Sequence, residues 1–333
     1  MWTWCLHAMR SAVTAIAIGT VSLSSASAQT GQPIRIGLSL ALTGAGAAPS
    51  KVISTALEMW RDDVNAKGGL LGRPVELVIY DDQSTPANVP AIYTKLVTLD
   101  KVDLLLGPYG TNFVAPAMPA IMAHNKMTIS FTAIGINDKF KYDKYFSMVP
   151  VGSDGVNAFS KGFFEMAAKQ NPKPQTVAIV AADAEFGLNA CEGARENVKA
   201  AGLTVVYDRR YPSATTDLAP VVRAIAETNP DLVIVCSYPP DSVGMVRAVN
   251  EVGFKPKMIG GAMVGLQSTA IKARLGPLLN GWTNYDYWLP VPKMRFAGVD
   301  DLMKKYQARA AVEGVDALGY YMAPWAYAQI QVL

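Results

Sequence analysis

The chain has 333 residues, of which 50% are hydrophobic and 17% charged, with 30 lysines and arginines against 27 aspartates and glutamates. This much apolar material favours a large folded core and excludes a disordered chain. The net charge of +3 is too small for the basic surface that binds DNA or RNA, so nucleic acid is excluded as a partner.

Residues 1–28 have the pattern of a secretory signal peptide. Arg10 precedes an uncharged run of small and apolar residues, and Ala26-Ser27-Ala28 is a small-residue cleavage signal. The run is shorter than the roughly 20 residues that a membrane helix needs. We therefore expect cleavage after Ala28 and export, with no lipid anchor because no cysteine stands at the cleavage site.

Few residues of the exported chain can carry catalysis or bind a metal. His7 leaves with the signal peptide, and His124, near the predicted end of a helix, is expected to be solvated there. The sequence contains no HExxH, CxxC or GxSxG motif. We therefore expect no catalytic residue, no metal and no cofactor.

Cys191 and Cys236 are the cysteines that remain after export. They could pair in an oxidising compartment, but both lie in apolar stretches, where an unpaired cysteine behaves as a small hydrophobic residue. We expect two buried thiols.

The elements in chain order begin with strands predicted over 34–40, 75–80, 103–106, 127–131 and 145–149, and helices over 50–67, 86–99 and 112–123. The alternation restarts with strands over 175–182, 203–210, 231–237 and 257–260, and helices over 185–201, 216–228 and 242–252. An extended aromatic-rich segment over 281–289 and helices over 299–312 and 316–333 follow. Strands that alternate with helices imply parallel sheets, because a parallel crossover needs a helix to return the chain.

The pattern predicts an α/β fold of two Rossmann-like lobes with parallel sheets joined by a hinge. Lobe 1 is expected to comprise residues 29–152 and 287–333, and lobe 2 residues 153–286. The space between two such lobes is a natural ligand cleft.

The segment 42–49 follows a strand and nearly matches the GxGxxG loop of dinucleotide-binding proteins. Pro49 replaces the third glycine, and Asp81 and Asp82 come too late for the ribose-binding acid, which is expected about 20 residues on. A close turn between strand and helix is favoured. The strand-end carboxylates Asp81, Asp82, Asp183 and Glu185 are expected to be solvated or to cap turns, since nothing shows that two of them face each other.

Position is the strongest signal for a site. Ligands of open α/β sheets bind beyond the carboxyl ends of the strands, where helix N-termini expose backbone N–H groups. The loops there, over 107–112, 132–135, 183–187 and 237–240, combine glycine or small polar residues with nearby aromatic residues. Donors and flat rings suit an organic carboxylate, although turns also need glycine for their own geometry.

Several motifs occur in a characteristic order: Ile34-Arg35-Ile36-Gly37 with Thr43-Gly44, the block from Asn65 to Arg73 (NAKGGLLGR), Asp81-Asp82, Gly107-Pro108, Thr216-Asp217, Asn229-Pro230-Asp231 and Arg247. In these the sequence resembles the branched-chain amino acid (leucine, isoleucine, valine) binding family of periplasmic solute-binding proteins, the receptors of ABC importers with the type I periplasmic binding fold. The resemblance spans nearly the whole exported chain, and the NAKGG block is its most specific part. It implies a monomeric periplasmic receptor that closes on a small molecule and delivers it to an ABC permease in the inner membrane.

The resemblance also implies which residues hold the ligand. Lobe 1 would bind its carboxylate through Thr111 and the segment Thr132–Ile134, and lobe 2 would add Phe186 and Tyr238. With their neighbours in the loops, the expected ligand-binding set is Tyr109, Thr111, Asn112, Thr132, Ala133, Ile134, Asp183, Phe186, Tyr238, Ala262, Met263 and Tyr285.

Some positions depart from the family pattern. The acid that receives a ligand ammonium falls at Ala262, a threonine becomes Ile134, a tyrosine becomes Pro49, and the lobe 1 disulfide positions fall at Ser84 and Gly110. A buried ammonium without a carboxylate is costly. Unless Asp183 or Glu185 replaces the missing acid, we expect an aromatic or hydrophobic carboxylate without an α-amino group.

Other functions remain open at this point. They are binding of a branched-chain or other amino acid within the same transporter class, a secreted α/β hydrolase that recruits His124, and a sensor module that reports its ligand to a receptor. The resemblance further leads us to expect several dozen residues beyond Leu333, including a last crossing to lobe 2.

Overall fold

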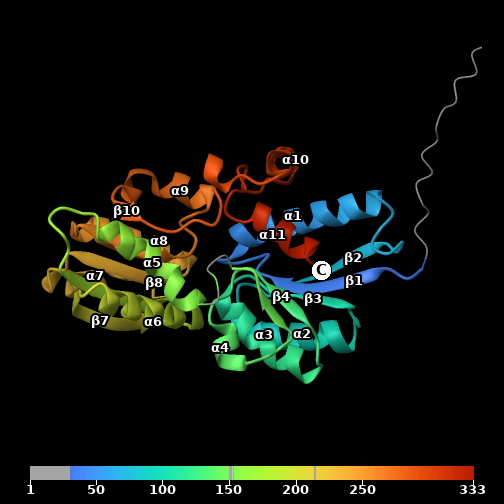
Figure 1. Ribbon diagram of the computed structural model, residues 1–333, viewed down its shortest axis with the longest axis horizontal. Helices are drawn as coiled ribbons and strands as arrows, with labels where there is room; N and C mark the ends of the chain where they lie inside the picture. The colour runs from blue at the N-terminus through green and yellow to red at the C-terminus, as the bar shows by residue number, and fades with distance from the viewer. Residues whose placement is uncertain (1–30, 150–151, 153, 214) are drawn as a thin grey trace, which may run out of the picture.

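The computed structural model describes residues 31–149, 152, 154–213 and 215–333. These residues form two five-stranded sheets, one in each of two lobes that lie side by side (Figure 1). The strand orders are β2-β1-β3-β4-β5 and β10-β9-β8-β6-β7, and every strand pair is parallel. The predicted α/β fold of two lobes with parallel sheets is therefore confirmed. The predicted signal peptide lies outside the described residues.

Lobe 1 contains the first sheet. Its strands are β1 (Ile34–Leu40), β2 (Val75–Asp81), β3 (Leu104–Leu106), β4 (Thr128–Ser130) and β5 (Tyr145–Ser147). Its helices are α1 (Ala47–Ala66), η1 (Pro86–Asn88), α2 (Val89–Thr98), α3 (Thr111–Ala123) and α4 (Ile136–Phe140).

Both faces of this sheet are covered, as a parallel sheet requires. Helix α1 packs with Ile36 and Leu38 on one face, and α2 and α3 pack with Leu105 on the other. The last described helices, α10 (Val299–Glu313) and α11 (Ala323–Gln331), return to lobe 1 and lie beside α1 (Figure 1). Arg309 of α10 forms ion pairs with Glu58 and Asp62 of α1, at 2.6 and 2.8 Å, and these pairs join the two helices.

Lobe 2 contains the second sheet. Its strands are β6 (Thr176–Asp183), β7 (Thr204–Pro212), β8 (Leu232–Ser237), β9 (Met258–Met263) and β10 (Trp282–Thr283). Helices α5 (Gly155–Ala167) and α6 (Glu185–Ala200) cover one face, and α7 (Ala219–Glu227) and α8 (Pro239–Val252) cover the other. Helix α9 (Thr269–Leu275), η2 (Gly276–Leu279) and, beyond β10, η3 (Pro292–Met294) complete the described elements.

Some helices differ from the prediction. Helices α4, α5 and α9 were not predicted; in α5, Gly155 and Gly162 weaken the helical signal that the buried Phe159 and Phe163 provide. The helix predicted over 316–333 begins only at Ala323, because the Asp316 carboxylate accepts the N–H groups of the turn that precedes it.

The prediction of two buried thiols is wrong. Cys191 and Cys236 are both fully buried, but they form a disulfide between α6 and β8, with Cα atoms 6.0 Å apart. The cause is the packing of α6 directly on β8, a contact that joins residues 45 positions apart in the chain.

The chain passes between the lobes from β5 to α5 and again from β10 to α10. The lobe boundaries predicted at 152/153 and 286/287 fall in these segments and stay a prediction. Within the described residues, no helix combines the length and the apolar character of a membrane span.

Candidate ligand-binding cleft

A cavity of about 420 Å³ opens where the carboxyl ends of both sheets meet. Lobe 1 lines it with Ala45, Gly46, Ser84, Pro86, Tyr109, Asn112 and Phe113, and lobe 2 with Ala184, Glu185, Ser213, Tyr238, Pro239, Pro240 and Asp241. This volume is typical of a site for a small organic molecule. The cavity lies at the strand ends where the sequence predicts a ligand.

Two buried threonines connect the loops after β3 and β4. The Gly110 N–H donates to Thr132 Oγ1 at 2.8 Å, and the Ile134 N–H donates to Thr111 Oγ1 at 3.1 Å. A hydroxyl that accepts a hydrogen bond still carries a hydrogen that it can donate. Thr111 and Thr132 therefore fix the two loops beside each other and keep donor capacity at the start of α3.

The glycine-rich loop after β1 is a close turn, as predicted. Its Gly46 N–H donates to Ser84 Oγ at 2.9 Å, and the Ser84 hydroxyl donates to the Thr43 carbonyl at 2.6 Å. Gly44 has φ +81°, and a Cβ there would lie 2.7 Å from Ser84 Oγ. The loop therefore rests on the segment after β2 and forms the lobe 1 rim of the cavity.

Asp81 and Asp82 have different environments at the end of β2. Asp81 accepts from the Thr43 hydroxyl at 2.6 Å and from the Leu42 N–H at 2.9 Å. Partial burial acts to raise its pKa, but these hydrogen bonds together hold the pKa below its usual value. Asp81 is thus a capping residue, as expected.

Asp82 is not solvated but caps the turn after β2, the second of the two roles expected for it. Only 1% of it is exposed, and its carboxylate accepts from the Ser39 hydroxyl and the Ser84 N–H, each at 3.1 Å. Burial raises the pKa of Asp82 to about 6, because the charged form loses its hydration.

Of the predicted aromatic pair of lobe 2, Tyr238 lines the cavity and Phe186 is buried against it. Phe186, at the start of α6, and Tyr238, just before α8, have ring centroids 5.4 Å apart in an edge-to-face arrangement. Phe159 of α5 supports Phe186 from behind, also at 5.4 Å. These contacts position the Tyr238 ring at the cavity.

Hydrogen bonds join the two lobes beside the cavity. The Phe186 N–H donates to Asn112 Oδ1 at 2.8 Å, and Asn189 Nδ2 donates to the Ile134 carbonyl at 3.1 Å. Lys139 and Glu185 form an ion pair at 3.0 Å across the same boundary. The loops predicted to hold the ligand therefore also form the contact between the lobes.

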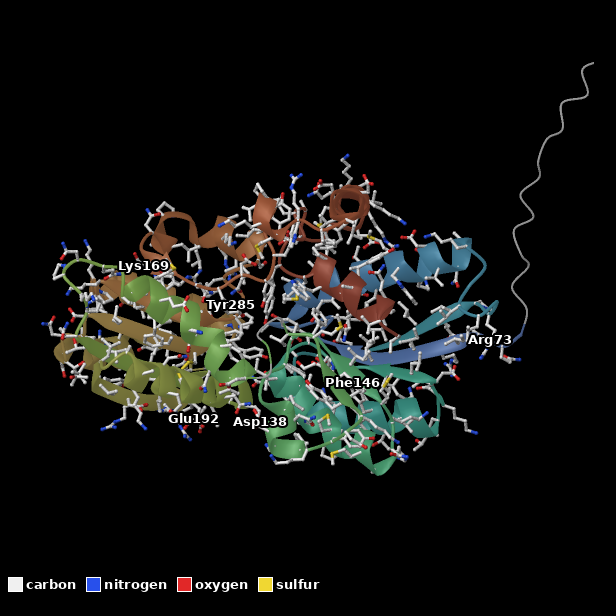
Figure 2. All side chains as sticks on the ribbon, viewed as in Figure 1. Arg73, Asp138, Phe146, Lys169, Glu192 and Tyr285 are labelled. Atoms are coloured by element: carbon white, nitrogen blue, oxygen red, sulfur yellow. A yellow bond between two sulfur atoms is a disulfide. The ribbon has the colours of Figure 1, made fainter. Side chains whose placement is uncertain are left out.

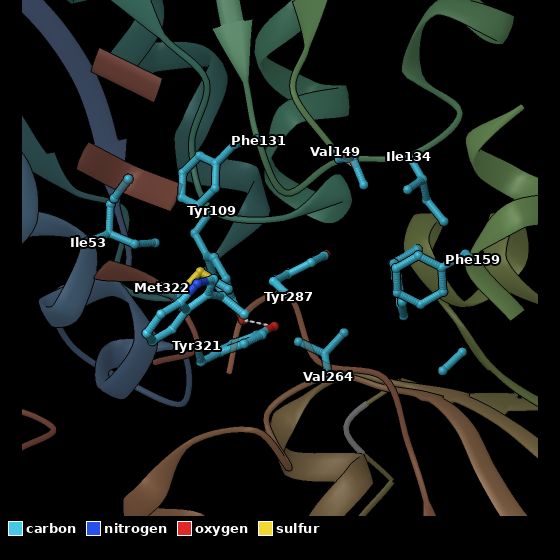
Figure 3. Packing of buried hydrophobic residues seen from close by; sticks show 14 of the residues in the cluster. Ile53, Tyr109, Phe131, Ile134, Val149, Phe159, Val264, Tyr287, Tyr321 and Met322 are labelled. Carbon is cyan, nitrogen blue, oxygen red and sulfur yellow. Dashed lines mark hydrogen bonds between the residues drawn. The ribbon is translucent and has the colours of Figure 1, made fainter. Parts of the chain in front are cut away.

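Four tyrosines cluster where the lobes meet: Tyr109, Tyr287 and Tyr321 are buried (Figure 3), and Tyr285 is partly buried beside them. The Tyr321 hydroxyl lies 3.3 Å from that of Tyr109 and 3.4 Å from that of Tyr285, and the Tyr287 ring stacks on Tyr321 with centroids 5.6 Å apart. Figure 2 shows Tyr285 near the place where the two lobes meet. Burial raises the pKa of each of these tyrosines, so the cluster offers neutral hydroxyl groups and flat rings.

The remaining predicted site residues lie away from the cavity wall. Asp183 is exposed, with its carboxylate 3.9 Å from Arg210. Ala262 and Met263 are fully buried in β9. Ala133 and Ile134 line a separate cavity of about 100 Å³ near the first crossing between the lobes.

Sequence reasoning missed two kinds of site residue. Asp241, Phe113, Pro239 and Pro240 line the cavity but were not in the expected set; the Pro-Pro-Asp start of a helix after a buried strand was the available signal. Tyr321 joins the tyrosine cluster from the turn before α11, and no sequence pattern around it indicated this position.

His124 is exposed at the carboxyl end of α3, whereas the cavity lies at the amino end of that helix. The described residues contain no cluster of three or more His, Cys, Asp or Glu side chains that could hold a metal ion.

Two α/β lobes with a cavity between their strand ends define a ligand receptor of the bilobal class. A family model described as periplasmic binding protein matches residues 33–331, and the chain belongs to this family. It is 28% identical over 288 residues to Leu/Ile/Val-binding protein homolog 8 of Brucella abortus (strain 2308), an alignment that covers 83% of this chain and 70% of the relative. The family is one of solute-binding receptors and is not an enzyme class.

Solved structures share the fold at low sequence identity. The substrate-binding protein LivJ of Streptococcus pneumoniae, in complex with isoleucine, aligns with a TM-score of 0.76 at 18% identity and covers 90% of this chain and 82% of its own. An ABC transporter solute-binding protein of R. palustris in complex with 4-hydroxybenzoate aligns with a TM-score of 0.74 at 21% identity, over 90% and 79% of the chains. Another from R. palustris, in complex with benzoate, has a TM-score of 0.73 at 18% identity, again over 90% and 79%.

Proposed function

We propose that this protein is a periplasmic receptor that binds a small aromatic or hydrophobic carboxylate and delivers it to an ABC permease by hinge closure. The observation that carries the proposal is the cavity whose walls come from the strand-end loops of both lobes. A ligand that contacts both walls favours the closed arrangement, because only contacts that differ between two states shift their populations.

The carboxylate would lie at the start of α3. This helix N-terminus faces the cavity through Asn112, and the N–H groups of its first turn together with the helix dipole favour an anion there. The hydroxyl groups of Thr111 and Thr132 lie in the same loops. The helix and the hydroxyl groups thus support binding of a negative charge.

The body of the ligand would lie against rings. Tyr109, Phe113 and Tyr238 line the cavity together with Pro239 and Pro240, and flat apolar walls favour an aromatic or branched apolar group. Proteins of the same fold bind benzoate and 4-hydroxybenzoate, which supports this ligand class.

Binding of a branched-chain amino acid is the second candidate. Ala262 is buried in β9 and supplies no acid, but Glu185 and Asp241 line the lobe 2 wall and could receive an ammonium group. The name of the Brucella relative and the isoleucine complex of LivJ favour this candidate. The two candidates differ in whether a lobe 2 carboxylate contacts the ligand.

Isothermal titration with benzoate, 4-hydroxybenzoate, leucine and isoleucine separates them. We expect micromolar or tighter binding of at least one aromatic acid and no detectable binding of either amino acid. The Glu185→Gln variant should bind the aromatic acid about as tightly as the wild type, since it loses no partner of a carboxylate and glutamine can still accept a hydrogen bond from Lys139. Glu192→Gln, an exposed change on the same helix, is the control.

The proposal fails if leucine or isoleucine binds at micromolar concentration, the aromatic acids do not bind, and Glu185→Gln weakens amino acid binding tenfold or more. Uptake of radiolabelled ligand by cells with and without the gene separates delivery to a permease from a sensor role. A transport receptor is required for uptake, whereas loss of a sensor leaves the uptake step intact.

A further inference from the structure

The hydroxyl group of Tyr238 reaches across the cleft to the start of α3. Gly110, the residue before α3, has φ +90°, and a Cβ at this position would overlap the Tyr238 hydroxyl oxygen. The hydroxyl oxygen therefore lies against the backbone at the N-terminus of α3, next to the N–H groups of Thr111 and Asn112. A lobe 2 side chain thus lies where the first turn of a lobe 1 helix exposes its donors.

The position of Tyr238 is fixed from both sides. Its carbonyl accepts the Ser242 N–H at 2.7 Å as α8 begins, and the Ser237 and Ser242 hydroxyl groups lie 2.8 Å apart. Its ring packs edge to face on Phe186. The Phe186 N–H donates in turn to Asn112 Oδ1, so the same turn of α3 receives two groups from lobe 2.

A phenol oxygen and a carboxylate oxygen have the same role toward backbone N–H donors, but only the carboxylate carries a full charge. Burial raises the pKa of Tyr238 well above its ordinary value, so the hydroxyl is neutral there. The N-terminus of a helix prefers an anion. A ligand carboxylate is therefore the stronger acceptor for these donors.

We propose that Tyr238 is an internal competitor of the ligand: its hydroxyl group takes the position of a carboxylate oxygen at the start of α3, and it thereby holds the lobes together and sets how tightly carboxylates bind. This inference rests on the proposed function, because it assumes that the ligand carboxylate uses the same donors. Every carboxylate must first displace the hydroxyl, which lowers the apparent affinity for all of them by a common factor.

The Tyr238→Phe variant tests the inference, since it keeps the ring that packs on Phe186 and removes the competing oxygen. Titration with benzoate and 4-hydroxybenzoate should show binding about tenfold tighter than in the wild type, by the same factor for both acids. Tyr207→Phe removes a partly exposed hydroxyl from β7, outside the cavity lining, and should leave both affinities unchanged.

Small-angle X-ray scattering without ligand provides a second readout that does not depend on the ligand class. The radius of gyration of Tyr238→Phe should exceed that of the wild type and of Tyr207→Phe, because one contact between the lobes is lost. If neither acid binds any of the proteins, the proposed function fails and the scattering result alone decides whether Tyr238 holds the lobes together. An unchanged radius of gyration, or benzoate binding that is unchanged or weaker in Tyr238→Phe, overturns the inference.

Discussion

Asp82 and Gly110 are single residues of lobe 1 whose surroundings determine the loops next to the cleft. Asp82 is a buried acid that accepts a hydrogen bond from the N–H group of Ser84, a residue that lines the cavity. Gly110 has a backbone conformation that disfavours any side chain, and it lies against Tyr238. The protonation of Asp82 and the backbone geometry of Gly110 should each affect the free energy of unfolding of the protein.

We expect Asp82→Asn to stabilise the protein at neutral pH. The folded-state pKa of Asp82, about 6, lies above the ordinary value of 3.8. The folded protein therefore holds this proton more tightly than the unfolded chain, and the stability that it contributes is present below pH 4 and is lost as the pH rises through 6. Asparagine resembles the protonated acid and avoids the loss, which amounts to about 3 kcal/mol.

Urea unfolding of both proteins between pH 4 and pH 8 checks this expectation. The free energies of unfolding should agree near pH 4 and diverge in favour of Asp82→Asn by pH 8. A difference that does not change with pH would show that the buried carboxylate does not titrate in this range.

Gly110→Ala should cost more stability than an alanine at a glycine with free space around it. Gly202 also has a positive φ, +66°, but a Cβ there meets no atom within 4 Å, so Gly202→Ala measures backbone strain alone, about 1–2 kcal/mol. We expect a further loss at Gly110 from overlap with Tyr238. This excess should shrink when both alanine variants are made in the Tyr238→Phe background; an excess of the same size there would show that the hydroxyl is not its cause.

At the scale of elements, the disulfide joins the two segments that form the lobe 2 wall. Helix α6 begins with Glu185 and Phe186, and β8 leads directly into Tyr238. Cys191 and Cys236 connect these elements behind the wall. The bond therefore supports the alignment of the Phe186 and Tyr238 rings.

Removal of the disulfide by Cys191→Ala/Cys236→Ala should lower the free energy of unfolding by about 2–4 kcal/mol, as expected for a loop of this length. Urea unfolding with and without a reducing agent measures the effect. Reduction should destabilise the wild type and leave the double variant unchanged. Equal stability of the oxidised wild type and the double variant would mean that the bond contributes nothing.

Much of the element order could be predicted from sequence. Strands such as β1 and β8 are continuous apolar runs, and α1 has a clear apolar stripe that ends at two glycines. Helix α5 escaped prediction because glycines interrupt its pattern. The pairing of Cys191 with Cys236 could not be predicted, since it depends on which helix packs over which strand.

At the scale of the whole molecule, the lobes meet through aromatic rings and a few specific hydrogen bonds. Strand-end position was enough to place Tyr109, Asn112 and Tyr238 at the cavity. Ala262 was assigned through the family resemblance, and the structure places it fully buried in β9, outside the cavity lining; sequence order alone does not show whether a strand residue reaches the cleft. Tyr321 could not be found, since it enters the cluster from a distant part of the chain.

Asn189→Ala should weaken benzoate binding about fivefold. The variant loses the hydrogen bond to the Ile134 carbonyl across the lobes, which stabilises the closed arrangement by about 1 kcal/mol. Asn250→Ala is the matched control, because its side chain bonds only to lobe 2 carbonyl groups. Equal affinity of the two variants, measured by titration calorimetry, would show that the Asn189 contact does not contribute to closure.

A crystal structure of the benzoate complex tests the central claim most directly. The account predicts density for one benzoate between the lobes, with its carboxylate at the start of α3, near Thr111 and Thr132, and its ring against Tyr109 and Tyr238. Benzoate bound elsewhere on the molecule, or in the cleft with its carboxylate turned away from α3, would contradict the account.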